Sequence, residues 1–263
     1  MNTRQNRGQQ GFTLAELLVS STVFLLMAGA AFSLLGTSSQ RFKTDSQVLT
    51  SFQEARLGID QITRDIADAG YPPRSRFSTA APATNLYAAG PFAWAGTAYP
   101  TTPCTVGGNC TTPGAFDLIV ETDYDGTGVK WIRYQLAAGQ TTLMRAVVNK
   151  PAGGTTPDTS TSAAGVLLPY LQNVMNNASA AQITAIRAAY PSMFPGGNPV
   201  PMFTYTCDVT GGNPAPCTGT NNPADIREAD ICLIVQSQSP DAKTNQLRLV
   251  ELHGLGRRVN PNQ

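Results

Sequence analysis

A single carboxylate inside a long apolar run is the group in this sequence with the clearest chemical requirement. Between Phe12 and Leu35, Glu16 is the only charged residue. The run is long enough to cross a bilayer as a helix, for which about 20 apolar residues suffice. A carboxylate held at mid-bilayer costs about 2.5–3.5 kcal/mol. An ionisable group in a membrane segment therefore indicates a function, and we expect Glu16 to be paired with another group.

The segment that precedes the apolar run is short, polar and basic. It holds Arg4 and Arg7 but no acid, and Gly11 stands directly before the run. A secretory signal peptide differs, because its apolar region is short and a small-residue cleavage site follows it. Basic residues beside a membrane span stay cytoplasmic, so we expect the bulk of the chain on the opposite side of the membrane.

The stretch from Gly11 to Glu16, GFTLAE, resembles the class III signal of type IV pilins and of type II secretion pseudopilins. The resemblance implies that a prepilin peptidase cleaves between Gly11 and Phe12 and then methylates the new amine of Phe12. It also implies that Glu16 pairs with the free N-terminal amine of a neighbouring subunit, and a carboxylate in lipid is tolerable when it is paired. The alternative is an uncleaved signal anchor with an incidental glutamate.

Further stretches resemble the PilW type of minor pilin. Residues 62–71 read ITRDIADAGY, similar to the RDIRxAGY run of those proteins, with Ala67 in place of the second basic residue. The FTY segment at 203–205 and the predicted final hairpin also resemble PilW-type minor pilins and J-type minor pseudopilins.

These resemblances imply a minor pilin, a non-enzymatic structural subunit of a type IV pilus or pilus-like filament, with no cofactor. Its partners would be other pilin subunits, the prepilin peptidase, the inner-membrane assembly platform and, before assembly, membrane lipid. The chain would cross the inner membrane once, with its globular domain in the periplasm, and later join an extracellular filament. The alternatives are a J-type minor pseudopilin of a type II secretion system, a pilus-tip adhesin and a signal-anchored periplasmic enzyme.

Five cysteines are disulfide candidates if the chain faces the periplasm. Cys104 and Cys110 bracket a flexible loop, and Cys207 and Cys217 bracket another, so each pair is expected to staple its loop. Cys232 lies in an apolar run and is expected to be a buried thiol, although its pairing with Cys207 or Cys217 stays open.

Catalytic and zinc-binding patterns are not found in the sequence. His253 is the only histidine and no cysteine belongs to a CxxC pair, so a zinc site is poorly supported. A Ser-His-Asp or Cys-His site would have to use His253, and no GxSxG elbow accompanies it. A lone histidine in a predicted strand is more often structural.

Acidic residues follow a predicted strand and its turn. Asp117, Glu121, Asp123 and Asp125 could in principle form a paired acid site. Asp123, Asp125 and Gly126 also match the start of an EF-type calcium loop, but the later glutamate is lacking. Because Asp and Gly supply the backbone angles of a hairpin turn, we prefer a turn, and Asp123 and Asp125 stay weak metal candidates.

The charge balance argues against broad capture of nucleic acid. The net charge is +1, and removal of Arg4 and Arg7 leaves 16 basic against 17 acidic residues, a net charge of −1. Arg257 and Arg258 form a local basic pair, which we interpret as solvated surface.

A long helix must position the N-terminal motif. It is predicted over 12–69, as one helix or as two with a joint near Gly36. Gly70 and the prolines after it are a strong helix stop. Its second half carries one apolar stripe, with Asp65 among the residues of the polar side. The stripe comprises Val48, Phe52, Ala55, Ile59, Ile62, Ile66 and Ala69.

The predicted fold is α+β and pilin-like, a long helix packed on an antiparallel β-sheet domain with long loops. The predicted parts are a leader (1–11), a membrane-spanning or filament-core helix (12–35), an amphipathic helix (36–70) and a β-rich periplasmic or extracellular domain (71–263). Irregular surface segments are expected at 74–114 and 151–164. A short helix is expected at 178–190, with Ser179 as its cap. Alternation and β-prone runs predict strands at 116–121, 129–136, 142–148, 202–206, 226–236 and 246–255, and a strand or short turn at 167–174.

Overall fold

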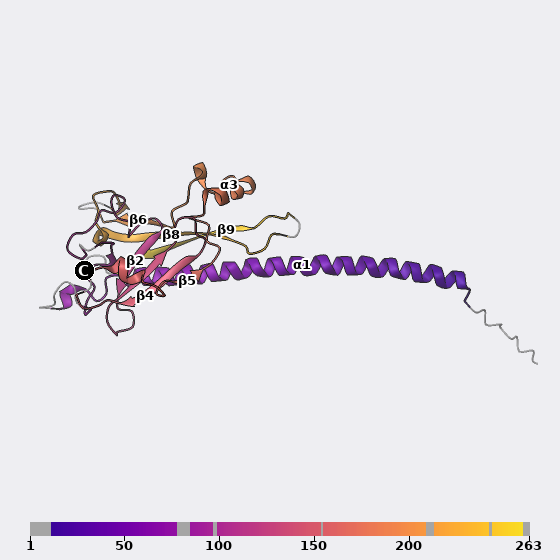
Figure 1. Cartoon of the computed structure of the whole chain (residues 1–263), viewed down its shortest axis with the longest axis horizontal. Coiled ribbons are helices and arrows are strands. Elements are labelled where there is room, and N and C mark those ends of the chain that lie inside the picture. The colour runs from indigo at the N-terminus through magenta and orange to yellow at the C-terminus, as the bar shows by residue number, and fades with distance from the viewer. Residues whose placement is uncertain are drawn as a thin grey trace, which may run out of the picture.

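The computed structural model describes residues 12–77, 85–96, 99–153, 155–208, 213–241 and 244–259. A long helix, α1, extends from a body of strands (Figure 1). The helices are α1 (Leu14–Ala67), α2 (Pro157–Thr161) and α3 (Ala180–Ala189), and 3-10 turns lie at Arg74–Arg76, Pro195–Gly197 and Pro223–Asp225. The strands are β1 (Phe92–Ala93), β2 (Asp117–Thr122), β3 (Lys130–Gln135), β4 (Leu143–Asn149), β5 (Leu168–Leu171), β6 (Phe203–Cys207), β7 (Ala215–Pro216), β8 (Ile226–Gln236) and β9 (Leu249–Arg257).

Helix α1 is continuous over 54 residues, which confirms the long helix and decides against two helices joined near Gly36. Residues 12–43 are exposed apart from the half-buried Ala28, and this part of α1 projects away from the strands (Figure 1). The helix ends at Ala67. Gly70 follows with a φ of +85°, a left-handed conformation that glycine adopts without a steric penalty.

The strands of the described residues form two antiparallel sheets. The first has the order β1-β2-β3-β4-β5 and contains the predicted meander. The second has the order β7-β6-β8-β9, and its last two strands are the predicted hairpin, with β9 at the edge. The α+β architecture with a long N-terminal helix on antiparallel strands is therefore confirmed.

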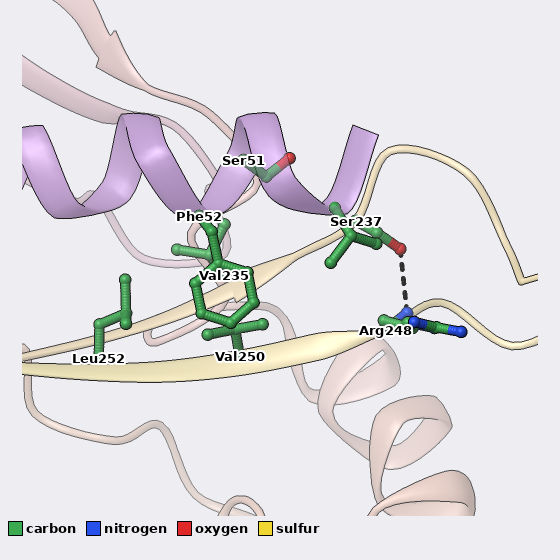
Figure 2. Close-up of a pocket in the computed structure, with 8 residues that line it drawn as sticks. Ser51, Phe52, Val235, Ser237, Arg248, Val250 and Leu252 are labelled. Carbon is green, nitrogen blue, oxygen red and sulfur yellow. Dashed lines mark hydrogen bonds between the residues drawn. The ribbon is translucent and has the colours of Figure 1, made fainter. Parts of the chain in front are cut away.

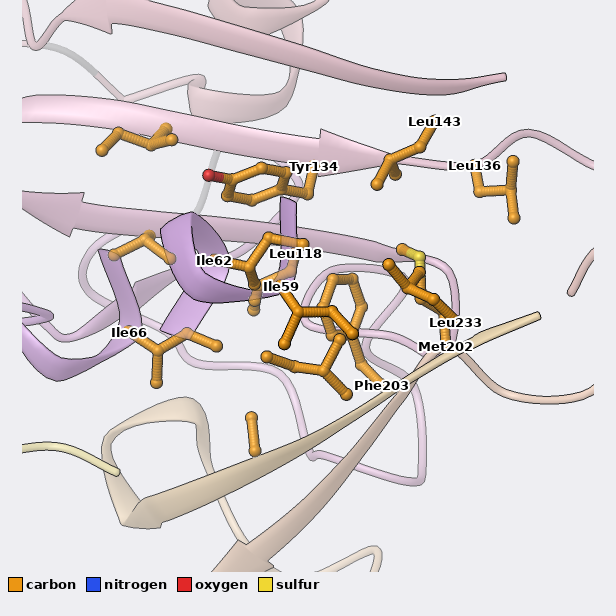
Figure 3. Close-up of a cluster of buried hydrophobic side chains, with 14 of the residues drawn as sticks. Ile59, Ile62, Ile66, Leu118, Tyr134, Leu136, Leu143, Met202, Phe203 and Leu233 are labelled. Atoms are coloured by element: carbon orange, nitrogen blue, oxygen red, sulfur yellow. The ribbon is translucent and has the colours of Figure 1, made fainter. Parts of the chain in front are cut away.

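One core joins the C-terminal part of α1 to both sheets. Ile59, Ile62 and Ile66 of α1 lie among side chains such as Tyr134 of the first sheet and Phe203 of the second (Figure 3). The three isoleucines belong to the predicted stripe, and each is at most 6% exposed. The stripe was expected to face a sheet, and the structure shows that it faces two.

Glycines allow the helix backbone to approach the strands closely. A Cβ on Gly254 of β9 would lie 2.2 Å from Ile59 Cγ2, and one on Gly256 would lie 2.9 Å from Ile66 Cβ. On the helix side, a Cβ on Gly58 would lie 2.4 Å from Leu171 Cδ1 of β5. At these points only one of the two packed elements contributes a side chain, which lies directly against the glycine backbone of the other.

The described residues of the segment 74–114 are largely irregular, as expected, but the expectation that this segment runs only over the surface was wrong. Trp94 and Tyr99 are buried against Ile119 and Trp131 on the face of the first sheet that points away from α1. Because β1 has only two residues, the large aromatic side chains after it contribute most of the apolar surface that this segment buries.

The segment at 151–164 was expected to be an irregular surface segment and instead contains α2. Thr161 in this helix is fully buried. Arg133 of β3 donates hydrogen bonds to the Asp158 carbonyl at 2.9 Å and to Thr161 Oγ1 at 3.2 Å. Because a buried guanidinium needs acceptors, these bonds hold α2 against the sheet.

Helix α3 is confirmed, with Ser179 as its N-cap in a capping box with Gln182. Its buried residues Ile183 and Ile186 pack near Ile234 on the face of the second sheet opposite α1. The helix therefore covers part of that face rather than lying free on the surface.

Candidate functional site

The N-terminal motif begins helix α1, and its carboxylate caps that helix. Thr13 is the N-cap residue, and its hydroxyl accepts a hydrogen bond from the Glu16 backbone N–H at 3.3 Å. The Glu16 carboxylate accepts bonds from the Thr13 N–H at 3.0 Å and from the Thr13 hydroxyl at 2.9 Å. This arrangement is a capping box, in which each side chain accepts a hydrogen bond from the backbone N–H of the other residue. Glu16 thus has a local partner in the single chain.

Phe12 stands one residue before this cap and is 84% exposed. Gly11, Arg4 and Arg7 lie outside the described residues. Cleavage before Phe12 and methylation of its nitrogen therefore stay predictions. A cut at that position would place the new amine at the same helix end as the Glu16 carboxylate.

The first part of α1 presents large apolar side chains to its surroundings. Transfer of such surface from water is favourable by about 25 cal/mol per Å², so this helix part requires lipid or protein around it. By length and composition, α1 is the helix among the described residues that could cross a membrane. The residues at least 59% exposed include Leu14, Leu17, Leu18, Val19, Phe24, Leu25, Leu26, Phe32 and Leu35.

A buried polar cluster fixes the other end of α1 to the first sheet. Asp65 is 5% exposed, which corrects its assignment to the solvated side of the helix. Its carboxylate accepts hydrogen bonds from Tyr134 Oη at 2.6 Å, Arg145 Nη2 at 3.1 Å and Gln61 Nε2 at 2.8 Å. Burial, with the Asp65 charge beside it, raises the pKa of Tyr134 well above its usual range, so this hydroxyl remains a donor.

A small pocket lies where α1 meets the β8–β9 hairpin (Figure 2). Arg248 closes one end, since its backbone N–H donates to Ser237 Oγ at 2.9 Å and its guanidinium pairs with Asp45 of α1 at 3.4 Å. The eight lining residues include no carboxylate, histidine or cysteine, so they offer no acid–base pair. They are Val48, Ser51, Phe52, Val235, Ser237, Arg248, Val250 and Leu252.

The acidic residues along β2 do not form a paired acid site in the described structure. Asp117 accepts two bonds from Arg133, at 2.9 and 2.5 Å. Glu121 is fully buried and forms an ion pair with Lys150, which is also fully buried. Each carboxylate is thus paired with a cation of the same sheet, Arg133 in β3 or Lys150 directly after β4, which is a structural role.

The predicted calcium candidates lie in the turn between β2 and β3. Asp125 accepts bonds from Thr127 and forms an ion pair with Lys130. These bonds, the one from Lys130 first, lower the pKa of Asp125 to about 2. Asp125 is thus engaged within its own hairpin, and Gly126 has a φ of +75°. The geometry supports the turn interpretation, while a metal at Asp123 and Asp125 stays an untested prediction.

The cysteines pair as their loops suggest. Cys104 is bonded to Cys110 and Cys207 to Cys217. Cys232 is a free thiol, half-buried rather than fully buried, and its Sγ lies 3.6 Å from Glu251 Oε1. Burial and this carboxylate raise the pKa of the Cys232 thiol to about 11, so the thiol is protonated at neutral pH.

Only one residue of the basic pair at the end of β9 is exposed, which corrects the interpretation of both residues as solvated surface. Arg257 is exposed and lies 3.3 Å from Glu228. Arg258 is buried, and its guanidinium donates to the carbonyl oxygens of Ala224 at 2.9 Å and Ile226 at 2.8 Å. Burial lowers the pKa of Arg258 to about 10. Arg258 therefore anchors the chain after β9.

Two functional features were missed from the sequence. Thr13 and Glu16 have the T-x-x-E spacing of a capping box, so this signal was present. The burial of Asp65 had no comparable local signal, because Tyr134 and Arg145 lie 69 and 80 residues further along the chain.

Comparison with known proteins supports the N-terminal motif. Residues 6–32 match the family described as the prokaryotic N-terminal methylation motif. No curated protein and no solved structure matches the chain significantly. The match covers the first part of α1 and the residues just before it, and that motif implies processing by a prepilin peptidase. Together with the long helix on antiparallel sheets, the match gives the chain a class III signal and a pilin-like architecture.

Proposed function

We propose that the chain is a minor pilin, a structural subunit built into a type IV pilus or a pilus-like filament. The observation that carries this proposal is the single carboxylate of Glu16 at the start of an exposed apolar helix part. Such a surface is unfavourable in water, and such a charge is unfavourable in an apolar environment unless it is paired. Both requirements are met where apolar helices of several subunits pack together and a free amine approaches Glu16.

In this proposal a prepilin peptidase cleaves between Gly11 and Phe12 and methylates Phe12. Before assembly the chain lies in the inner membrane with its β-rich domain in the periplasm, in contact with lipid and with the assembly platform. No cofactor is needed for this role. The proposed parts are the leader 1–11, the membrane or filament-core helix 12–35, the docking helix 36–70 and the exported domain 71–263.

The capping box supports a two-stage role for Glu16. In the single chain the carboxylate is held by neutral donors of Thr13 and by the positive end of the helix dipole. An ammonium group adds a Coulomb attraction to the carboxylate that the neutral donors of Thr13 lack, and this attraction grows as the surroundings become less polar. The amine of a neighbouring subunit would therefore compete successfully with Thr13 and fix the axial register of the two helices.

Substitution of Glu16 tests this role in cells. We expect Glu16→Ala to reach the membrane fraction at the wild-type level but to be depleted from sheared filaments. Glu54→Ala removes an exposed carboxylate from the docking part of the same helix and is the matched control. Thr13→Val removes the cap while keeping the carboxylate, which separates helix capping from pairing between subunits. Wild-type incorporation of Glu16→Ala would overturn the assembly role.

Mass spectrometry of the mature N-terminus tests the processing step independently. We expect a chain that begins at methylated Phe12. A mature chain that still begins at Met1 would show an uncleaved signal anchor instead.

A minor pseudopilin of a type II secretion system is the second candidate. The β6 segment and the β8–β9 hairpin resemble J-type pseudopilins as well as PilW-type minor pilins, and the N-terminal processing is the same. Deletion of the gene distinguishes the two. Loss of surface filaments supports the pilus role, whereas retained filaments with loss of exoprotein secretion support the pseudopilin role.

A further inference from the structure

The outer face of the β8–β9 hairpin brings together three side chains of metal-binding types. Gly254 and Gly256 of β9 lie against α1, so His253 and Glu251 point to the opposite face, because side chains alternate along a strand. Cys232 of β8 is the ladder partner of His253. The register of the two strands thus brings together a thiol, a carboxylate and an imidazole. Cys232 precedes Glu251 by 19 residues and His253 by 21 residues, and Glu251 and His253 lie on the same strand.

The potential ligand atoms are already close to the spacing that one metal ion requires. Cys232 Sγ lies 3.6 Å from Glu251 Oε1, which lies 3.2 Å from His253 Nε2, and all three ligand atoms are within 4.8 Å of one another. Ligands bound tetrahedrally to zinc at about 2.0–2.3 Å are about 3.3–3.8 Å apart. Small side-chain rotations would therefore complete the site.

We propose that Cys232, Glu251 and His253 bind one zinc ion. A thiolate and an imidazole favour zinc over calcium or magnesium, which prefer oxygen ligands. Binding replaces the thiol proton, which passes to the solvent. Three protein ligands leave the fourth position of a tetrahedral ion for water or for a group from another molecule.

The surroundings of the cluster allow an ion to enter. Cys232 is half-buried beside the apolar residues under α3, whereas the side chains of Glu251 and His253 are 39% and 69% exposed. Packing thus holds the Cys232 side chain in place, whereas the exposed side chains of Glu251 and His253 can rotate toward a bound ion. This face points away from α1, so the proposal does not depend on the assembly role of Glu16.

Cobalt titration of the full chain in detergent micelles tests the site. The protein is kept without reductant, so that both disulfides stay closed and Cys232 is the free thiol. We expect one Co²⁺ per chain, a sulfur-to-cobalt charge-transfer band with tetrahedral visible bands, and displacement by Zn²⁺. Zinc should also slow alkylation of Cys232 by iodoacetamide.

Variants identify the ligands. Cys232→Ser should abolish the charge-transfer band, and His253→Gln and Glu251→Gln should each weaken binding at least about tenfold, the lower end of what loss of an outer-shell partner costs. Glu228→Gln removes a carboxylate from the same face of β8 and should bind like the wild type. His253 and Glu251 are exposed, so their variants report on binding even if Cys232→Ser fails to fold.

Three results would overturn the proposal. The first is a wild-type chain without the sulfur-to-cobalt band, and the second is unchanged binding in His253→Gln and Glu251→Gln. The third is a purified protein whose Cys232 is consumed in a disulfide between two chains, which would make this cysteine an intermolecular link.

Discussion

Asp65 is the residue at which the β-rich domain holds its helix. Its carboxylate joins Tyr134 and Arg145 of neighbouring strands of the first sheet, and Arg145 Nε also donates to Tyr134 Oη at 2.9 Å. A polar group buried without partners is costly, and here every member of the cluster supports another. The cluster thus fixes the rotation of α1 about its own axis.

We expect Asp65→Asn to destabilise the folded chain by about 1–3 kcal/mol, because Tyr134 and Arg145 lose their charged acceptor. The measurement is the denaturant midpoint of unfolding at constant m-value. Asp60→Asn, an exposed acid on the same helix, should stay within about 0.5 kcal/mol of the wild type. Equal midpoints for the two variants would contradict the role of the cluster.

A second residue-scale prediction concerns Asp125. Its folded pKa of about 2 is below the ordinary value of about 3.9. A depressed carboxyl pKa stabilises the fold above the unfolded value, and this stabilisation is lost as the pH falls from about 3.9 through about 2. In Lys130→Met the pKa of Asp125, followed by carboxyl carbon NMR, should rise toward the ordinary value. Lys43→Met on the exposed part of α1 should leave it unchanged, and a pKa still near 2 in Lys130→Met would refute the assignment.

At the scale of elements, the contact between α1 and β9 depends on glycines where side chains would collide. Gly254 and Gly256 alternate with exposed residues, so the strand shows a bare backbone to the helix and its side chains to the other face. Close backbone approach is a recognised reason for glycine inside a strand. The same alternation that seats the helix also directs His253 toward Cys232.

We expect Gly254→Val to cost about 1–3 kcal/mol or more, because its Cβ would overlap Ile59. Hydrogen exchange should accelerate in β9, where the helix contact is lost. Ile59→Ala in the same chain should return part of the loss, which a double-mutant cycle measures. Leu255→Val, at the exposed position between the two glycines, is the control. A cycle with no coupling between 254 and 59 would contradict the close contact.

At the scale of the whole molecule, the long loops of the two sheets are tied to each other as well as stapled. The Val106 N–H, in the loop closed by Cys104 and Cys110, donates to the Asn221 carbonyl at 2.7 Å. Asn221 follows shortly after the Cys207–Cys217 bridge. Core packing against α1 therefore joins the two sheets, and the loops that carry the disulfides provide a second connection between them.

Removal of the Cys207–Cys217 bridge should lower the stability of the β-rich domain by about 2–3 kcal/mol, the range expected for a crosslink that closes a short loop. Thermal unfolding of Cys207→Ala/Cys217→Ala without reductant measures the effect. Cys232→Ala removes a cysteine but no crosslink and should melt close to the wild type. Identical melting temperatures for the two variants would show that the bridge contributes nothing.

The sequence by itself determined the features that depend on neighbours along the chain. The class III motif, the apolar run, the single stripe of α1, the helix stop at Gly70 and most strand positions follow from local spacing, since helix and strand periods act over a few residues. The short loops between Cys104 and Cys110 and between Cys207 and Cys217 likewise predicted their own bridges.

Only the tertiary structure decided which distant residues became neighbours. It placed Asp65 beside Tyr134, buried Arg258, ordered α2 under Arg133 and packed α1 against two sheets. It also brought Cys232 to Glu251 and His253, where composition alone had argued against zinc. The physical reason is that strand register and helix docking result from long-range pairing and packing, which the local pattern of a sequence does not specify.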